Sequence, residues 1–510
     1  MAADKVAGMA RIAVIGAGMG AMAAAARLAV AGHRVAVYER TETYGGAVRR
    51  FERDGFAFDT GPGLLPLPAV YRDLFVKTGK EPLESVVELV QVDPSSRHLF
   101  ADGTEVSLPN ASRAGVVAAL NEALGAGSGD RWGDFLVRAR EAWDRTRRPL
   151  LEEPLWPNWS VLADREPYPS VPHKKLLRTR RAGLLAEIGA WELRDPRLAA
   201  LLDGYALAYG LDPSTAPASA AVLPYMEHAF GTWYVRGGLR ELARAVYERC
   251  VARRVEFHFG AEVTGVVEKD GRAAGVEFAG GGVAEADQVV AGVDPARLAG
   301  LTEHPLYGEG GVQPAPAADR PGRFTVLLAL RGAREAGAVH RTVVHAPDRA
   351  AELDYLGSAR GEQARPTVTV LRPGDPALHP EGDFESVVLS ATVPTRGDWG
   401  VDATDDRFAD LMAAAAEAAV PGLRERLMWR EMRTPEHTEA ETGASFGAIP
   451  APALAAGEGR FLHPANTTPL PGLYRVGGWA HPGGGLPHAG MSGALAAGLI
   501  VEGPDFRGSQ

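Results

Sequence analysis

The sequence predicts an α/β protein of two domains, the first of which is assembled from three separated segments. A strand, a glycine-rich turn, a helix and a second strand follow one another within residues 11–39. A second unit of strand, glycine turn and helix lies at 472–501, and strand and helix patterns recur at 236–291. The 510 residues exceed what one hydrophobic core usually organises, which agrees with two domains.

The first unit has the order of a dinucleotide-binding site. A strand at Arg11–Ile15 leads into the turn Gly16-Ala17-Gly18-Met19-Gly20-Ala21, and a helix is predicted at Met22–Ala31 and a strand at His33–Tyr38. Gly16 permits the tight turn, and Gly18 lets the backbone approach a pyrophosphate at the positive end of the helix. Ala21 allows close packing of helix and strand, and Glu39 can accept hydrogen bonds from a ribose. The alternative is a structural glycine turn in an unrelated α/β fold.

Two glycine-containing stretches follow, Gly45-Gly46 and Phe58-Asp59-Thr60-Gly61-Pro62. Either they supply further backbone for a phosphate or a flavin, or they are surface turns. At the C-terminus, Gly472–Gly478 predicts a strand and its end, and the loop Trp479–Pro487 is dense in glycine and proline. The following helix, Gly490–Val501, either points its N-terminus at the cofactor or only caps the domain.

The middle of the chain continues the first domain after a long insertion. A helix is predicted at Leu239–Arg253 and strands at Val255–Phe259, Val263–Lys269 and Val289–Ala291. The predicted first domain comprises 8–75, 225–300 and 445–510, and the second comprises 76–224 and 301–444. For the second domain the patterns predict helices at Ala114–Leu124, Trp132–Arg145 and Arg407–Ala419, and strands at Phe324–Leu330 and Ser386–Val393.

Together these stretches resemble the bacterial phytoene desaturase family of flavoproteins, the carotenoid dehydrogenases. The resemblance covers nearly the whole chain, and its more specific parts are Pro224–Gly231 with Gly237-Gly238-Leu239, Val293-Asp294-Pro295, His463–Asn466 and Gly472–Ser492. The N-terminal part alone fits any FAD oxidase of the amine-oxidase kind. The resemblance implies a Rossmann-like, discontinuous FAD-binding domain and a mixed α+β substrate domain. Ala47, Trp479 and Gly484 depart from the family pattern, and Trp479 is expected to reshape the substrate pocket.

The resemblance also implies how the chain holds FAD. Gly16, Gly18 and Ala21 would line the pyrophosphate, Glu39 would bind the adenosine ribose, and the backbone of Val263 would touch the adenine. The remaining expected contacts with the cofactor are Gly20, Arg40, Gly45, Gly46, Arg49, Gly61, Pro62, Gly477, Gly478 and Met491.

The implied chemistry is desaturation of a long isoprenoid or polyene by hydride transfer to flavin N5. A proton acceptor is still needed, and His481 is the first candidate, with Glu227 and Arg236 from the middle block; His488 and His228 are further candidates. Each has the alternative role of a loop residue that holds the backbone in place. Three alternatives to desaturation stay open: a polyene isomerase or saturase, an amine or other small-molecule oxidase, and a flavin-binding partner protein without turnover.

Composition limits the other possibilities. A net charge of −10 disfavours nucleic acid as a partner, and one cysteine, Cys250, excludes an intrachain disulfide and a cysteine-based metal site. No metal site is expected, and nothing in the sequence indicates an oligomeric state. A cytoplasmic protein is expected, with peripheral membrane association through Leu150–Leu162 and the basic run Lys174–Arg181. The alternative is that the first segment packs internally and the second is a solvated helix face.

Overall fold

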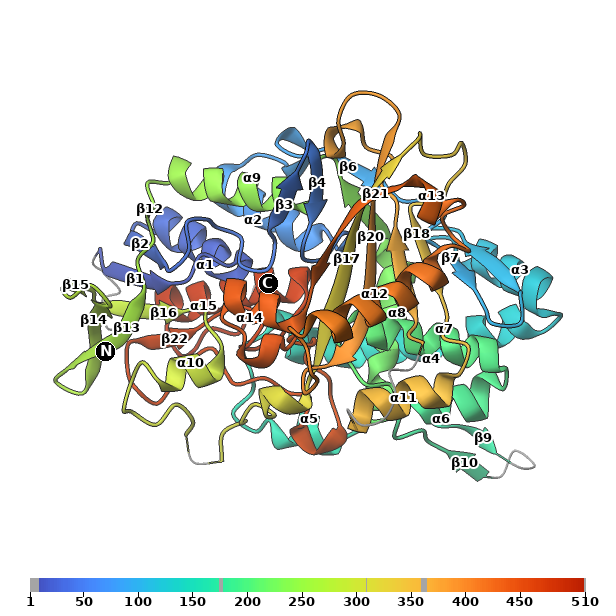
Figure 1. Cartoon of the computed structure of the whole chain (residues 1–510). Helices are drawn as coiled ribbons and strands as arrows, with labels where there is room; N and C mark the ends of the chain where they lie inside the picture. The colour runs from blue at the N-terminus through green and yellow to red at the C-terminus, as the bar shows by residue number, and fades with distance from the viewer. Residues whose placement is uncertain (1–8, 174–177, 309, 359–364, 509–510) are drawn as a thin grey trace.

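The computed structural model describes residues 9–173, 178–308, 310–358 and 365–508. Two sheets organise it (Figure 1), a five-stranded parallel sheet and a seven-stranded mixed sheet. The parallel sheet has the strand order β12 (Glu256–Phe259), β2 (Arg34–Glu39), β1 (Arg11–Ile15), β16 (Gln288–Ala291) and β22 (Leu473–Arg475). Segments far apart in sequence therefore meet in one sheet, as the three-segment domain requires. The boundaries assigned to the two domains remain a prediction.

Side chains of the central strand β1 alternate between two layers. Ile12 and Val14 face α1 (Met19–Val30), α9 (Leu239–Ala252) and α15 (Leu486–Glu502) in one buried cluster. Ala13 and Ile15 face a second cluster on the opposite side. That side is covered by β13 (Val263–Lys269), β14 (Arg272–Phe278), β15 (Val283–Glu285) and α10 (Pro295–Ala299). The sheet is buried on both faces, which is typical of parallel sheets.

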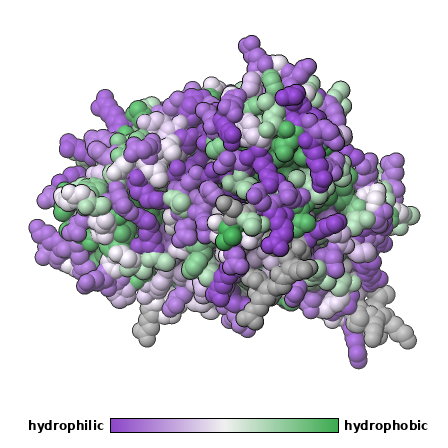
Figure 2. Space-filling model, in the orientation of Figure 1, coloured by the Kyte–Doolittle hydropathy of each residue, from purple (hydrophilic) through white to green (hydrophobic). Residues whose placement is uncertain are grey.

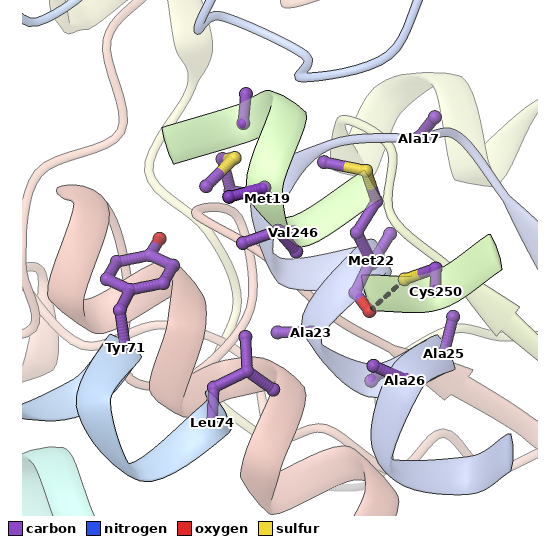
Figure 3. Close-up of a cluster of buried hydrophobic side chains, with 14 of the residues drawn as sticks. Ala17, Met19, Met22, Ala23, Ala25, Ala26, Tyr71, Leu74, Val246 and Cys250 are labelled. Carbon is purple, nitrogen blue, oxygen red and sulfur yellow. Dashed lines mark hydrogen bonds between the residues drawn. The ribbon is translucent and has the colours of Figure 1, made fainter. Parts of the chain in front are cut away.

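Helices α1 and α15 approach closely because both present small residues. A Cβ atom at Gly493 would lie 2.5 Å from the carbonyl oxygen of Gly20 and 2.8 Å from the Cβ of Ala23. Helix α9 packs on α1 as well, and the Cys250 thiol donates to the carbonyl oxygen of Met22 at 3.2 Å (Figure 3). Burial raises the pKa of this thiol to about 12, so the interpretation of Cys250 as a core residue is confirmed. Helices α1 and α15, near the two ends of the chain, thus lie side by side.

The seven-stranded sheet has the order β21 (Leu427–Arg433), β17 (Pro321–Arg331), β20 (Phe384–Pro394), β19 (Val368–Leu371), β18 (Arg341–Val344), β7 (Ser96–Leu99) and β8 (Glu105–Leu108). Helix α12 (Asp402–Ala416) crosses one face (Figure 1), where Phe408 packs against Phe324. On the other face, Phe56 and Phe58 of β4 (Phe56–Asp59) pack against Leu327. The predicted strands Phe324–Leu330 and Ser386–Val393 lie within β17 and β20.

A helical layer completes the second half of the molecule. It contains α3 (Arg113–Leu124), α4 (Ser128–Arg147), α6 (Leu185–Ile188), α7 (Pro196–Ala208) and α8 (Val222–Phe230). Trp132 and Phe135 are fully buried at its centre. The helices predicted at Ala114–Leu124 and Trp132–Arg145 lie within α3 and α4, and α4 continues into a π-helical turn at Arg148–Glu152.

The segment proposed as a membrane contact is mostly internal. Leu150 and Leu162 are buried in a cluster with Leu462, against which Trp159 packs, while Val161 is exposed. In the basic run, Arg178–Arg180 form the strand β10, so a helical face is wrong for that part, and residues 174–177 lie outside the described residues. No helix in the described ranges is both long and apolar enough to cross a bilayer.

Candidate functional site

The turn after β1 is shaped by two glycines with different roles. Gly16 has a φ of +88°, which favours glycine, and its N–H donates to the carbonyl oxygen of Tyr38 at 2.8 Å. Gly18 precedes the first turn of α1, which begins at Met19 rather than at Met22. A Cβ atom at Gly18 would meet nothing within 4 Å. The backbone at Gly18 therefore faces open space at the N-terminus of the helix, where a phosphate is favoured.

The second glycine pair lies directly against this turn. The N–H of Gly45 donates to the carbonyl oxygen of Ala17 at 2.8 Å, and a Cβ at Gly46 would lie 3.0 Å from the Cα of Gly18. Gly61 packs against a different part of the backbone, because a Cβ atom there would lie 2.1 Å from the carbonyl oxygen of Ala47. Gly46 thus borders the open space, whereas Gly61 allows two stretches of backbone to pass each other.

Glu39, at the end of β2, is buried and held by backbone. Its Oε2 accepts from the N–H of Ala17 at 2.8 Å, and its Oε1 accepts from the N–H and the hydroxyl of Thr41 at 2.9 Å and 2.8 Å. These bonds fix the carboxylate beside the glycine turn. A carboxylate has about four acceptor positions, so capacity remains for a hydroxyl group of a ligand.

A cavity joins these residues and adds positive charge. Arg49 borders it and donates to the carbonyl oxygens of Gly46 and Glu441, both at 2.9 Å. Burial lowers the pKa of Arg49, although nearby carboxylates act in the opposite direction. The lining consists of Ile15, Gly16, Gly18, Tyr38, Glu39, Arg40, Gly46, Arg49, Ala261, Val263, Gly292, Val293, Arg297, Glu441 and Thr442. Backbone approach at glycine, a fixed carboxylate and three arginines fit the ribose and diphosphate of a dinucleotide.

The C-terminal glycine loop comes up to the same turn. A Cβ at Gly20 would lie 2.7 Å from the Cα of Gly477 and 2.7 Å from the carbonyl oxygen of Ala489. Gly477 itself has a φ of +93° and open space where its side chain would be, and its N–H donates to the Ser492 hydroxyl at 3.0 Å. Two glycines with open space, Gly18 and Gly477, therefore flank the packed Gly20.

Other predicted contacts lie around this junction. Ala21 is buried in α1, and a Cβ at Gly292 would lie 3.1 Å from its Cβ. Gly478 is close to Pro450, since a Cβ at Gly478 would lie 2.8 Å from the proline ring. The guanidinium of Arg320 lies 5.4 Å from the Trp479 ring centre. Met491 packs against the apolar cluster described next, whereas Pro62 is exposed and borders neither of the two cavities described.

A second cavity, lined mainly by carbon, lies at the N-terminal end of α15. Its lining residues are Trp143, Thr146, Arg147, Leu150, Leu151, Ser219, Val222, Ala453, Leu454, Ala455 and His488. Trp143 and Leu151 belong to the buried cluster against which Val222 and Met491 pack. The walls of this cavity are mostly apolar and come from α4, the turn Arg148–Glu152, α8, the segment at 453–455 and α15.

The three candidate catalytic residues are held in separate sets of contacts. His481 is fully buried, its Nε2 donates to the carbonyl oxygen of Glu153 at 2.9 Å, and burial lowers its pKa to about 4. Glu227 of α8 pairs with Arg341 at 2.8 Å.

Arg236 pairs with Glu88 at 3.2 Å near the surface. None of these three lines either cavity. Among the described residues, no group of three His, Cys, Asp or Glu is arranged to hold a metal ion.

Several lining residues were not predicted as site residues from the sequence. Tyr38, Arg297, Glu441 and Thr442 border the nucleotide-like cavity. Arg297 follows Val293-Asp294-Pro295, a stretch that contributed to the family resemblance, whereas Glu441 and Thr442 lie in α14 (Pro435–Thr442), which carries no recognisable motif. His488, a minor candidate in the sequence, lines the apolar cavity.

Comparison with known proteins agrees with this geometry. The 4,4'-diapolycopene oxygenase of Methylomonas sp is 28% identical over 96% of this chain and 98% of its own length. A hydroxyneurosporene desaturase of Cereibacter sphaeroides is 30% identical over 96% of this chain and 97% of its own length.

Solved structures share the fold. An oxidoreductase from Methanosarcina mazei has a TM-score of 0.63 at 20% identity, covering 95% of this chain and 99% of its own. Putrescine oxidase with bound putrescine has a TM-score of 0.64 at 16% identity, covering 97% and 99%. The family described as flavin containing amine oxidoreductase matches residues 22–501. The chain therefore belongs to the flavin-containing amine oxidoreductase family and is an oxidoreductase that uses FAD.

Proposed function

We propose that this enzyme introduces double bonds into a long isoprenoid or carotenoid polyene. The observation that carries the proposal is the similarity over nearly the whole chain to relatives named carotenoid desaturases, and the cavity at the N-terminal end of α15, the helix that packs on α1, adds mostly apolar walls. A hydrocarbon substrate needs such walls, because apolar surface is stabilised when it leaves water. Relatives aligned over nearly the whole chain carry names of carotenoid desaturases, which supports the same substrate class.

The residues proposed to hold FAD are those predicted from the sequence that border the first cavity, above all Gly16, Gly18, Glu39 and Arg49. The N–H groups at the start of α1 and the arginines would bind the diphosphate, and Glu39 would accept from the ribose. Gly477 would let the rest of the cofactor pass close to the backbone. When bound, FAD supplies a two-electron acceptor for hydride.

The chain's own contribution to the reaction is orientation and exclusion of water. Trp143, Leu151 and Val222 would restrict where an extended apolar chain can lie, and the burial of Trp143 and Leu151 would keep solvent away from the reacting carbons.

The experiment is desaturation in liposomes. Purified enzyme with FAD is incubated with phytoene-type and with lycopene-type polyenes, and the visible spectrum is followed. A red shift supports desaturation, whereas a blue shift means saturation and a change of isomer without net oxidation means isomerisation. Hydrogen peroxide release from a diamine, with no change in any polyene, would overturn the proposal in favour of an amine oxidase.

Membrane contact is part of this proposal, because such substrates reside in bilayers. The face in Figure 2 is largely hydrophilic with scattered hydrophobic patches. Val161, on α5 (Ser160–Asp164), is exposed beside buried Leu162, and Arg178 is exposed on β10. We expect Val161→Asp to weaken cosedimentation with anionic liposomes. Cosedimentation equal to that of the wild-type enzyme would argue against this contact.

A further inference from the structure

Helix α14 links the seven-stranded sheet to the nucleotide-like cavity. It follows directly after β21, the edge strand of that sheet, and packs against β21 and β17. In Figure 1 it lies between the seven-stranded sheet and the parallel sheet. Its last residues, Glu441 and Thr442, line the cavity together with Gly16, Gly18 and Glu39. One wall of the cavity therefore comes from a helix that packs on the other sheet.

The last turn of α14 presents carbonyl oxygens to two arginines that line the cavity. Nη2 of Arg40 donates to the carbonyl oxygen of Ala440 at 2.5 Å, and Nη2 of Arg49 donates to that of Glu441 at 2.9 Å. The last carbonyl groups of a helix have no partner within the helix and carry partial negative charge, so guanidinium groups bind there favourably. Gly443, with a φ of +72°, ends the helix directly after this turn. Both arginines are therefore held by α14.

Arg49 is fixed by two further bonds. Its Nε donates to the carbonyl oxygen of Gly46 at 2.9 Å, and its Nη2 also donates to the hydroxyl of Thr41 at 3.1 Å. The bonds of Arg49 to Gly46, Thr41 and Glu441 use Nε and Nη2, and none of these bonds uses Nη1. A guanidinium is planar and its donors have fixed directions, so fixing two nitrogens also fixes the third. Arg49 can therefore donate from Nη1 to an anion in the cavity without losing these contacts.

Arg433 restrains the last turn of α14 from outside the cavity. It is the last residue of β21, and its guanidinium pairs with the carboxylate of Glu441. The side chain of Arg433 is only 11% exposed, so solvent and salt screen this pair less than a pair on the open surface. Arg433 lines neither cavity. It ties the end of the strand to the end of the following helix, and so fixes the carbonyl groups that hold Arg40 and Arg49.

We propose that the last turn of α14 holds Arg40 and Arg49 in position for the diphosphate of FAD, and that Arg433 is a positioning residue for this site. The inference rests on the proposed place of FAD in the first cavity. A free arginine side chain loses rotational freedom when it binds a phosphate, so a guanidinium that is already held binds more tightly. Without the ion pair of Arg433, the last turn of α14 frays and both arginines lose this advantage. The contact therefore contributes to binding of the diphosphate and not to binding of the adenosine.

The test compares Arg433→Gln with a matched control, Arg430→Gln. Arg430 lies on the same strand and pairs with Asp406 and Asp410 at 2.6 Å and 2.5 Å, and it does not line the cavity. The Arg433→Gln holoenzyme should release FAD about tenfold faster than the wild-type enzyme, measured as the rise of flavin fluorescence after dilution, and the control should stay within about twofold. Arg433→Lys keeps an ion pair with Glu441 and should stay within about threefold of the wild-type rate.

Ligands without a flavin separate positioning from a general loss of structure. Calorimetry with the apoprotein should give a Kd for ADP that rises about tenfold in Arg433→Gln, and a Kd for adenosine that changes by less than about twofold. A general loosening of the cavity would weaken both ligands alike, and this result would overturn the inference, as would an unchanged Kd for ADP. Wild-type apoprotein that binds FAD without competition from ADP would instead overturn the proposed place of FAD in this cavity.

A double-mutant cycle shows whether Arg433 acts through Arg49. With Arg49→Gln already present, Arg433→Gln should weaken ADP binding by less than about threefold, because only Arg40 is left to be displaced. A full tenfold loss in that background would contradict the inference. Hydrogen exchange tests the same contact without any variant, since ADP should slow amide exchange at 439–444 in the wild-type protein more than adenosine does. Equal exchange with the two ligands would also contradict it.

Discussion

The two cavities are built from different materials. The nucleotide-like cavity is walled by glycine backbone, arginines and the fixed Glu39. The apolar cavity is walled by ordinary side chains such as Trp143 and Val222, and by His488. In the nucleotide-like cavity, the absence of glycine side chains creates the site, so adding a side chain should abolish or strongly weaken cofactor binding. In the apolar cavity, the volume of the side chains creates the site, so substitutions should change the desaturation rate gradually with side-chain size.

The largest effect is expected for Gly20→Val, which attacks the contact between the two ends of the chain. Its Cβ would lie 2.7 Å from backbone atoms of both Gly477 and Ala489, where neither neighbour is the end of a flexible side chain. Overpacking a rigid contact costs about 3 kcal/mol or more at such sites. Thermal unfolding should shift strongly downward and purified protein should be colourless.

Gly280→Ala is the matched control for Gly20→Val, because a Cβ there meets nothing within 4 Å and its φ is not in the left-handed region. It should change stability by less than about 0.5 kcal/mol. If the Gly20→Val protein were yellow from bound flavin and as stable as the wild-type enzyme, the contact between α1 and α15 would tolerate a larger side chain at this position.

Gly18→Val comes next and separates folding from cofactor binding. Its φ of −70° suits any residue, and the added side chain enters open space. The apoprotein should unfold at the wild-type temperature, but its Kd for FAD should rise about 100-fold, which corresponds to about 2.7 kcal/mol. Tryptophan fluorescence during FAD titration gives the constant. Unchanged affinity would place the diphosphate elsewhere.

In the apolar cavity, Val222→Phe should lower desaturation about tenfold and leave FAD content unchanged. The larger ring occupies part of the space beside His488 and displaces the substrate from its reactive position. Val222→Ala enlarges the cavity and serves as the control, with a smaller change in rate. Equal activity of both variants with a polyene would mean that the substrate lies outside this cavity.

The difference between a site built from glycine backbone and a site built from side chains also explains which features could be predicted from the sequence. Strand β1 has the predicted bounds, and Gly16, Gly18 and Glu39 meet around one cavity, because their roles follow from local backbone geometry. The helix α1 was predicted to begin at Met22. It begins at Met19, since the helix starts directly after the turn that Gly16 makes.

Residues brought in over long distances could not be predicted in the same way. Arg297 and Glu441 border the nucleotide-like cavity more than 250 residues from the glycine turn, and no local pattern marks them. His481 is the first candidate from the sequence, yet His488, seven residues further on in the first turn of α15, is the histidine that lines the apolar cavity. The direction in which each imidazole points depends on how α15 packs against α4 and α8.

The last predicted effect is on stability and concerns Asp59, which lies where the two halves meet. It follows Phe58, which packs on the seven-stranded sheet, and its carboxylate accepts from the N–H groups of Leu239 and Arg240 at 2.7 Å and 3.2 Å. Burial raises its pKa to about 6, outweighing these bonds and nearby Arg50. The protonated form is therefore favoured in the folded state, compared with a pKa of about 3.9 in the unfolded chain.

Stability from Asp59 should be complete below about pH 4 and should be lost as pH rises through about 6. Asp59→Asn removes this titration and keeps an acceptor for the N-terminus of α9. Between pH 4 and pH 7, the free energy of unfolding of the wild-type enzyme should fall by about 2 kcal/mol more than that of the variant. Denaturant unfolding at both pH values measures this. Parallel pH dependence would show that Asp59 stays ionised, and the junction between the two halves would then be more polar than its burial indicates.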